Sequence, residues 1–253
     1  MTSTTTHCKK NRRPKLAPRY TLKVDEDRKD GEEEKRLLNT QQAELVREVF
    51  TSATCRCFVL KSFSEANFHK SLKYGIWSTT TLHNALLDQV FQSDLTAVRP
   101  VLFFFSVCGT KHFNGVARMT SAVRTDAQFQ LWEKLKYEGF FHVEWLLVKD
   151  VPNFVFTGVK MSNTPTKKSI TSCRDCEEVL FEEVRRSGSA HEFLSIFTDF
   201  DSRSSAWDDF AHYDQLQEQI ERKRGLILPE GADKADVESI LVPLQPEEPT
   251  TIS

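Results

Sequence analysis

The sequence predicts one α/β domain built on a mixed, curved β-sheet that is flanked by α-helices. The chain has 253 residues, which suits one large domain or one domain with long tails. Hydrophobic residues make up 39% of it, which is enough for a sizeable core. Strand-like and helix-like segments alternate irregularly, without the strict βαβ period of a doubly wound sheet. A mixed sheet therefore fits the pattern better than a parallel one, and no internal repeat is visible.

Both ends of the chain are predicted to be disordered. Residues 1–24 carry basic but no acidic side chains, and residues 25–36 alternate acid and base with almost nothing apolar, so residues 1–36 are interpreted as a basic arm and a charged linker. The basic run KKNRRPK also suits a nuclear-localisation signal or an arm that contacts phosphates. Residues 229–253 combine four prolines with an acidic bias and are interpreted as a tail.

The body begins with a flanking helical segment at residues 37–54, in which residues 37–50 are predicted to be helical. CFVLK, at residues 57–61, is a short apolar run typical of a buried strand. Ser64 is suited to cap a helix over residues 65–74.

The rest of the body continues the alternation. Apolar residues at helical spacing predict a helix at residues 84–91, and Pro100 precedes VLFFFSV, a dense apolar run that predicts a buried strand. Further strands are predicted at residues 113–119, 143–148, 154–159 and 178–181, and further helices at 191–197 and 206–224, the last within a C-terminal helical segment at 201–228.

Charge and motifs exclude several function classes. The net charge of −2 gives no global reason to bind a polyanion, so a nucleic-acid role needs a local patch. The nucleotide-binding and metalloprotease motifs GxGxxG, P-loop and HExxH are absent from the sequence, so no cofactor is expected. The N-terminus lacks the apolar stretch of a secretory signal, and the apolar runs are too short to span a bilayer. We expect no membrane association, reduced thiols and a cytoplasmic location, with the nucleus as the alternative.

Six cysteines leave two chemical alternatives open. The CxC at Cys55 and Cys57 and the CxxC at Cys173 and Cys176 offer the four thiols of a structural zinc site. Small buried side chains are the favoured interpretation of these four, because neither spacing is specific. Cys108 with His112 suits a nucleophile, but no orienting partner accompanies the pair. We therefore expect neither a metal site nor a catalytic residue.

Two tryptophans differ from the others in their surroundings. Trp145 alternates with apolar residues in VEWLLV and is most simply core. Trp77 and Trp132 lie beside polar or flexible segments, and Tyr137 follows Trp132 after a short loop. Such rings either pack against a loop or, near Lys61, stack an unpaired base close to phosphates. The residues alone leave both interpretations open.

Six motifs follow one another along the body of the chain: CFVLKSFSEANFHKSLKYGIWSTT, LDQVF, RPVLFFFSV, FNGVARM, GFFHVEWLLVKDVPN and SCRDCEEV. In this order they resemble a known family, the YTH domain in its fungal type, which reads N6-methyladenosine in single-stranded RNA. The similarity covers residues 55–200, which we interpret as an RNA-binding domain. The resemblance implies a PUA-like sheet that closes toward a barrel.

The resemblance also implies an aromatic cage of Trp77, Trp132 and Tyr137 that receives the methyl group. It assigns the adenine edge to the Asn67 side chain, the Phe63 backbone amide and the Ser78 carbonyl. Ring nitrogens need donors, and the methylated amine keeps one hydrogen that needs an acceptor, so each role is chemically sensible.

Lys61 and Arg174 match positions that grip flanking phosphates in the family. Two residues depart from the family pattern. Cys108 stands where Asn usually follows FSV, which puts a loop near the site in doubt, and Tyr137 stands where Trp or Leu is common, which keeps an aromatic wall.

The expected function is therefore an mRNA reader and not an enzyme. Its expected partners are single-stranded mRNA containing N6-methyladenosine and, by analogy with relatives, the mRNA decay machinery that deadenylates transcripts. We expect a monomer that influences transcript stability. The alternatives are a nucleobase-modifying enzyme, which needs a general base or metal in the pocket, and a methyl-lysine-binding module, which needs acidic cage residues.

Overall fold

The computed structural model describes residues 28–52, 55–94, 99–181, 188–225 and 240–244. Residues 1–36 and 37–253 form separate units, and the packing described below belongs to the second. In chain order the helices and strands are α1 (Arg28–Ser52), β1 (Arg56–Ser62), α2 (Glu65–Tyr74), β2 (Ile76–Trp77), α3 (Thr81–Asp94), β3 (Val101–Val107), β4 (His112–Met119), β5 (Ala127–Phe129), β6 (Phe141–Pro152), η1 (Asn153–Phe156), η2 (Ile170–Ser172), β7 (Glu177–Val179), α4 (Ser189–Asp199), α5 (Phe210–Arg224) and β8 (Leu241–Pro243).

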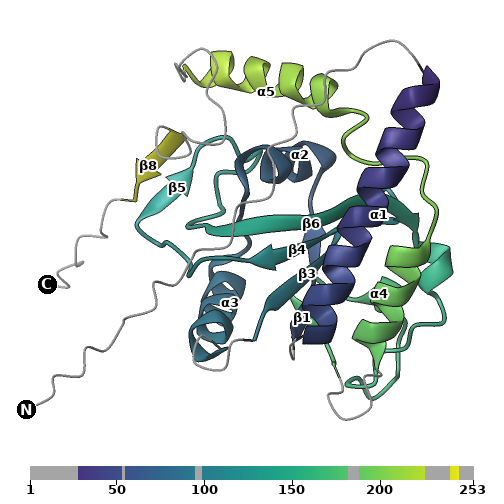
Figure 1. The fold of residues 1–253 in the computed structure, drawn as a ribbon. Helices are drawn as coiled ribbons and strands as arrows, with labels where there is room; N and C mark the ends of the chain where they lie inside the picture. Colours follow the sequence, from purple (N-terminus) through teal and green to yellow (C-terminus); the bar gives the residue numbers. More distant parts are fainter. Residues whose placement is uncertain (1–27, 53–54, 95–98, 182–187, 226–239, 245–253) are drawn as a thin grey trace, which may run out of the picture. The chain divides into compact units, whose positions relative to one another are not determined.

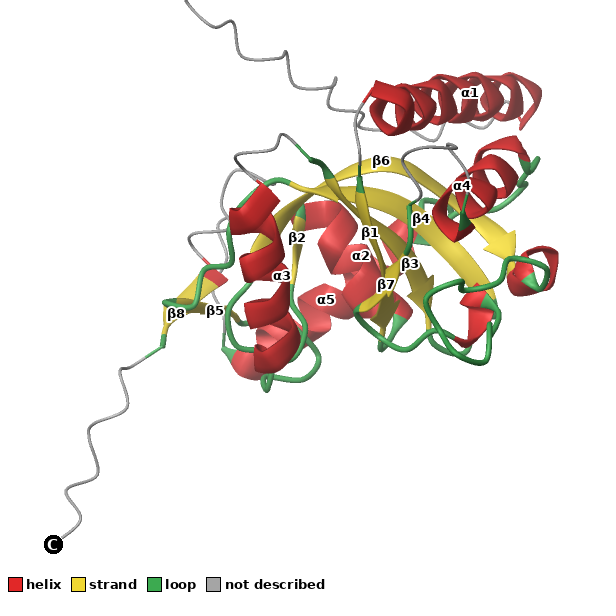
Figure 2. Cartoon of the chain, turned by 90° about the horizontal axis from the view of Figure 1, so that it is seen from below, coloured by secondary structure: helices red, strands yellow, loops and turns green. Residues whose placement is uncertain are grey.

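A six-stranded sheet in the order β2-β6-β4-β3-β1-β7 forms the centre of the domain (Figure 1). β1 and β3 are parallel, and the other neighbouring pairs are antiparallel. The sheet is mixed and strongly curved, and helices cover both of its faces (Figure 2). The predicted fold class is confirmed.

Each face of the sheet carries its own core, and strand periodicity divides the residues between them. In β3, Phe103 and Phe105 join the cluster beneath α2, whereas Leu102 and Phe104 join the cluster toward α4. Successive side chains of a strand point to opposite faces, so a strand covered on both sides is apolar throughout. This explains the uninterrupted run VLFFFSV.

Local signals fix α2, the helix nearest the site. The Ser64 hydroxyl accepts a hydrogen bond from the backbone nitrogen of Asn67, as the predicted cap requires. Gly75 ends the helix with φ +64°, a left-handed conformation that glycine adopts without strain. The turn leads directly into β2, which places Trp77 on the edge of the sheet beside β6.

Several predicted boundaries are wrong. α1 begins at Arg28, inside the segment interpreted as linker, because acid–base alternation prevents a core but supports a helix. The strand predicted at residues 154–159 is instead η1, because β6 continues to Pro152 and the chain then turns there, with the Asn153 nitrogen donating to the Lys111 carbonyl. The last helix begins at Phe210 and not at residue 206, after a run of turns.

The structure also adds short strands that the sequence did not indicate. β2 is one of these, and the other two, β5 and β8, pair with each other. β8 lies within the predicted disordered tail, and that prediction is wrong at residues 240–244, where Ile240 is buried in the core. The rest of the tail and the arm at residues 1–24 lie outside the described residues, and the domain boundaries at residues 55 and 200 remain predictions.

Candidate nucleic-acid interface

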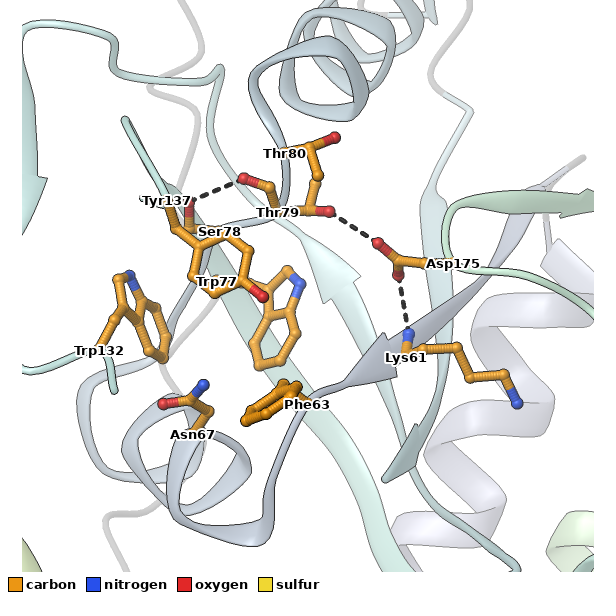
Figure 3. Close-up of a pocket in the computed structure, with 10 residues that line it drawn as sticks. All are labelled: Lys61, Phe63, Asn67, Trp77, Ser78, Thr79, Thr80, Trp132, Tyr137 and Asp175. Carbon is orange, nitrogen blue, oxygen red and sulfur yellow. Dashed lines mark hydrogen bonds between the residues drawn. The ribbon is translucent and has the colours of Figure 1, made fainter. Parts of the chain in front are cut away.

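An open pocket of about 390 Å³ lies beside the edge of the sheet where β2 pairs with β6 (Figure 3). Seven of the eight residues predicted for the site line it, and Arg174 does not. The residues that line the pocket are Lys61, Phe63, Asn67, Trp77, Ser78, Thr79, Thr80, Trp132, Tyr137 and Asp175.

Two tryptophans form the back walls of the pocket. The rings of Trp77 and Trp132 meet edge to face, with centroids 5.7 Å apart. Trp77 packs against Phe105, and Trp132 packs against Phe129. They expose only 4% and 2% of their surface, so each ring is both a wall of the pocket and part of the core. The interpretation of these rings as packing residues is therefore confirmed, and their contact with a ligand stays a prediction.

Tyr137 forms the third wall and is only partly buried. Burial raises the pKa of its hydroxyl, so the ring is neutral at physiological pH. The indole nitrogens of Trp77 and Trp132 are buried and have no hydrogen-bond partner among the described residues. The walls of the pocket are thus uncharged aromatic rings.

Hydrogen bonds tie the segment that carries Trp77 to the segment that carries Tyr137. The Ser78 hydroxyl donates to the Gly139 carbonyl at 2.7 Å, and the Asn84 amide donates to the Glu138 carbonyl at 2.8 Å. Gly139 has φ +72°, and a Cβ there would lie 2.6 Å from the Arg124 carbonyl oxygen. Glycine is therefore required at this crossing.

Asn67 holds the Trp132 segment from the α2 side. Its side-chain oxygen accepts a hydrogen bond from the Glu133 backbone nitrogen at 3.1 Å, and the Ser64 hydroxyl donates to the Glu133 carboxylate. With its oxygen engaged, the Asn67 amide nitrogen points toward the space between the two tryptophans (Figure 3). A donor at this position suits an acceptor atom of a bound base.

Asp175 joins three parts of the pocket, and sequence reasoning missed it. One carboxylate oxygen accepts from the Lys61 backbone nitrogen and the other from the Thr79 hydroxyl, both at 2.8 Å. His83 lies 3.3 Å from the second oxygen. The pocket therefore contains one carboxylate, with His83 beside it. In the CxxC turn the sequence drew attention to the two thiols and to Arg174, and the partners of Asp175 are distant in sequence.

The cations near the pocket differ in where they point. The Lys61 side chain leads away from the aromatic walls (Figure 3) and lies over the Phe113 ring, where burial lowers its pKa. Lys134 lies over the ring of Phe63, which is half exposed at the rim. Arg174 is exposed next to Asp175 in the CxxC turn.

The four buried cysteines, Cys55, Cys57, Cys173 and Cys176, are small members of the core. Burial raises the pKa of each thiol, to about 11 for Cys173 and about 12 for Cys55 and Cys176. In the part of the chain that the structure describes, no three His, Cys, Asp or Glu residues are arranged to hold a metal ion. Within the same residues, no helix is long and apolar enough to cross a membrane.

Fold and pocket together define a binding module with a preformed aromatic cage. Residues 55–189 match the model of the YT521-B-like domain, and the chain belongs to this family, the YTH family. The human YTH domain-containing family protein 3 is 40% identical over 169 residues, which is 67% of this chain and 28% of that protein. The human family protein 2 is 39% identical over 166 residues, 66% of this chain and 27% of that protein. The chain thus aligns with little more than a quarter of these relatives.

Two solved structures are similar to the domain. One is the YTH domain of Pho92 in complex with m6A, with a TM-score of 0.53 and 30% identity over 58% of this chain and 89% of that one. The other is the YTH domain of Zygosaccharomyces rouxii MRB1 in complex with N6-methyladenosine RNA, with a TM-score of 0.51 and 30% identity over 59% and 90%. These matches confirm the family that the motifs indicated.

Proposed function

We propose that this protein binds N6-methyladenosine in single-stranded RNA through the pocket of Trp77, Trp132 and Tyr137. The observation that carries the proposal is the joint position of three aromatic walls and the Asn67 amide nitrogen, which faces the space between the tryptophans. The complexes of Pho92 and MRB1 with the same modified nucleotide support it. Because the base must enter the pocket whole, the ligand is single-stranded or locally opened.

Each polar group of the pocket has a role in this proposal. Asn67 donates to a ring nitrogen of the adenine, and the Phe63 backbone amide donates to another. The Ser78 carbonyl accepts the one hydrogen left on the methylated amine. Lys61 and Arg174 contact flanking phosphates, which adds affinity without reading sequence.

The energies of base stacking and of methyl burial show which interaction supplies affinity and which supplies selectivity. Stacking a base on an aromatic ring contributes about 1–3 kcal/mol, whereas burying one methyl contributes about 0.8 kcal/mol. Stacking therefore supplies affinity for any adenosine, and the methyl adds a factor of about four. The methylated base is uncharged, so cation–π attraction of the kind used by methyl-lysine cages contributes little.

Matched titrations test the proposal. Short RNAs that differ only in the methyl group, and trimethyl-lysine peptides, are titrated by fluorescence anisotropy, and the RNA is recovered for mass spectrometry. Tighter binding of the methylated RNA with unchanged nucleosides supports the proposal. Preference for the peptide, equal affinity for both RNAs, or conversion of the base would refute it in favour of the corresponding alternative.

We further propose that the protein is a cytoplasmic monomer that shortens or lengthens the lifetime of methylated mRNAs through the decay machinery. This step rests on analogy with relatives that regulate mRNA. Crosslinking and sequencing of bound RNA in cells with and without adenosine methylation, combined with transcript half-lives, test it. Binding sites that persist without methylation would contradict it.

A further inference from the structure

Helix α5 lies outside the matched region 55–189, yet its last residue reaches the cage. The Arg224 guanidinium donates to the carbonyl of Gln130, to that of Trp132 at 3.0 Å and to that of Glu133 at 3.4 Å. These carbonyls belong to the segment that carries Trp132, which contains neither helix nor strand. One side chain thus supplies several donors to a segment that lacks the regular backbone hydrogen bonds of a helix or a strand.

The same segment is also held from α2 and its cap. Asn67 accepts from the Glu133 nitrogen, and Ser64 donates to the Glu133 carboxylate. The backbone that carries Trp132 is therefore held by Arg224 from α5 and by Asn67 with Ser64 from the start of α2. Because the ring is a pocket wall, a shift of this backbone moves the wall.

α5 is itself anchored on α2. Lys73 pairs with Asp214 at 2.7 Å, and the Gln217 amide donates to the Tyr74 hydroxyl at 2.6 Å. The rings of His69 and Phe210 lie 4.3 Å apart between their centroids. These contacts hold the first half of α5 against α2, and the last turn of the same helix carries Arg224 to the Trp132 segment.

We propose that Arg224 is a positioning residue of the base pocket, which extends the reader's functional unit to α5. The inference rests on the proposed function. Arginine suits the task because its planar fork carries five donors in a fixed geometry, and the three carbonyls lie close together in sequence. Removal of the fork frees the Trp132 segment and widens or misaligns the pocket.

The test compares Arg224→Gln and Arg224→Lys with Arg222→Gln. Arg222 lies on the same helix turn but is exposed and pairs only with Glu218 among the described residues, so its variant is a matched control. Free N6-methyladenosine nucleoside is titrated beside methylated and unmethylated RNA. The nucleoside has no phosphate, so its affinity reports the pocket alone.

The expected result is about a tenfold weaker affinity of Arg224→Gln for the nucleoside and the methylated RNA, with an intermediate loss for Arg224→Lys and none for Arg222→Gln. In ¹⁹F spectra of protein labelled with 5-fluorotryptophan, the Trp132 signal of the Arg224 variants should shift or broaden while the Trp145 signal stays. Thermal unfolding shows whether each variant is folded, and Arg224→Lys carries the test if Arg224→Gln is not.

If the Arg224 variants lose affinity for RNA but not for the nucleoside, Arg224 is a phosphate contact and the inference is overturned. Unchanged affinities for every ligand would overturn it as well. If wild-type protein fails to prefer the methylated RNA over the unmethylated RNA, the proposed function fails. In that case the ¹⁹F signal of Trp132 alone decides about Arg224, and an unperturbed signal in its variants overturns the positioning role.

Discussion

Replacement of Asn67 by aspartate changes one atom at the pocket and leaves the shape nearly the same. The Asn67 oxygen is engaged by the Glu133 nitrogen, so only the amide nitrogen faces the pocket. In Asn67→Asp one oxygen can still accept from Glu133, and the atom that faces the adenine becomes an acceptor. At pH 7 an ionised carboxylate there repels the ring nitrogen that the amide would bind.

The magnitude follows from the local contacts. The net contribution of one hydrogen bond is about 0.5–1.5 kcal/mol, and a buried acceptor that faces another acceptor and stays unsatisfied costs about 1–3 kcal/mol. We expect a loss of about 1–2 kcal/mol, or about five- to thirtyfold in affinity, at pH 7. Asn67 is 3% exposed, and Glu133 and Asp175 place negative charge nearby. Burial and these charges both raise the pKa of the introduced carboxyl.

The sign of the pH dependence follows. A protonated carboxyl donates where the ionised form cannot, so affinity of Asn67→Asp recovers as pH falls through its raised pKa, whereas wild type stays flat. Asn67→Ala loses affinity at every pH, and its loss at low pH exceeds that of Asn67→Asp because the Glu133 contact is gone as well. Dissociation constants for the nucleoside between pH 5 and 8, with circular dichroism as a control, measure this. Equal affinity of wild type and Asn67→Asp across that range would refute the reasoning.

Three further predictions concern the walls of the pocket, the phosphate contacts and the thiols. Tyr137→Ala should weaken the binding of methylated RNA about tenfold with little change in melting temperature. Trp132→Ala should weaken binding and also destabilise the fold by about 3–5 kcal/mol, because that ring is buried; a stable Trp132→Ala variant with normal binding would contradict the wall assignment. Lys61→Ala and Arg174→Ala should weaken the binding of methylated and of unmethylated RNA equally, and the affinity should then depend less on salt concentration. A several-fold change in methyl selectivity at constant salt would count against phosphate contacts. Iodoacetamide at pH 8 should modify Cys108, which is exposed, far faster than the four buried cysteines, as peptide mapping will show; comparable rates would disprove their burial.

The parts of the fold that could be predicted are those whose signals are local. The hydroxyl of Ser64 caps α2 within three residues, and the apolar run of β3 reports that both faces of the strand are covered. Elements that depend on distant pairing escaped prediction. β8 forms only because Leu241 and its neighbours meet β5, more than a hundred residues earlier, and a stretch so short carries no periodicity.

The site residues also divide into those that sequence motifs indicated and those that only the folded structure reveals. The aromatic walls were found through long motifs in register, because the residues alone left both packing and stacking open. Asp175 and Arg224 were missed because neither forms its contacts near itself in the sequence. Asp175 bonds to Lys61 and Thr79, and Arg224 bonds to the segment around Trp132. An acid inside a CxxC turn and an arginine at the end of a helix have ordinary local explanations, so only the folded arrangement distinguishes them.

The composition of the cage bears on how a single methyl is recognised. Methyl burial alone yields about fourfold selectivity, so stronger discrimination has to come from the unmethylated base. In the proposed complex, an unmethylated amine directs a second hydrogen into the corner between Trp77 and Trp132. The two indole rings, which meet edge to face, line that corner. A donor that loses water and finds no acceptor costs about 1–3 kcal/mol. We therefore propose that the walls select for the methyl group chiefly by withholding an acceptor from the amine that lacks it.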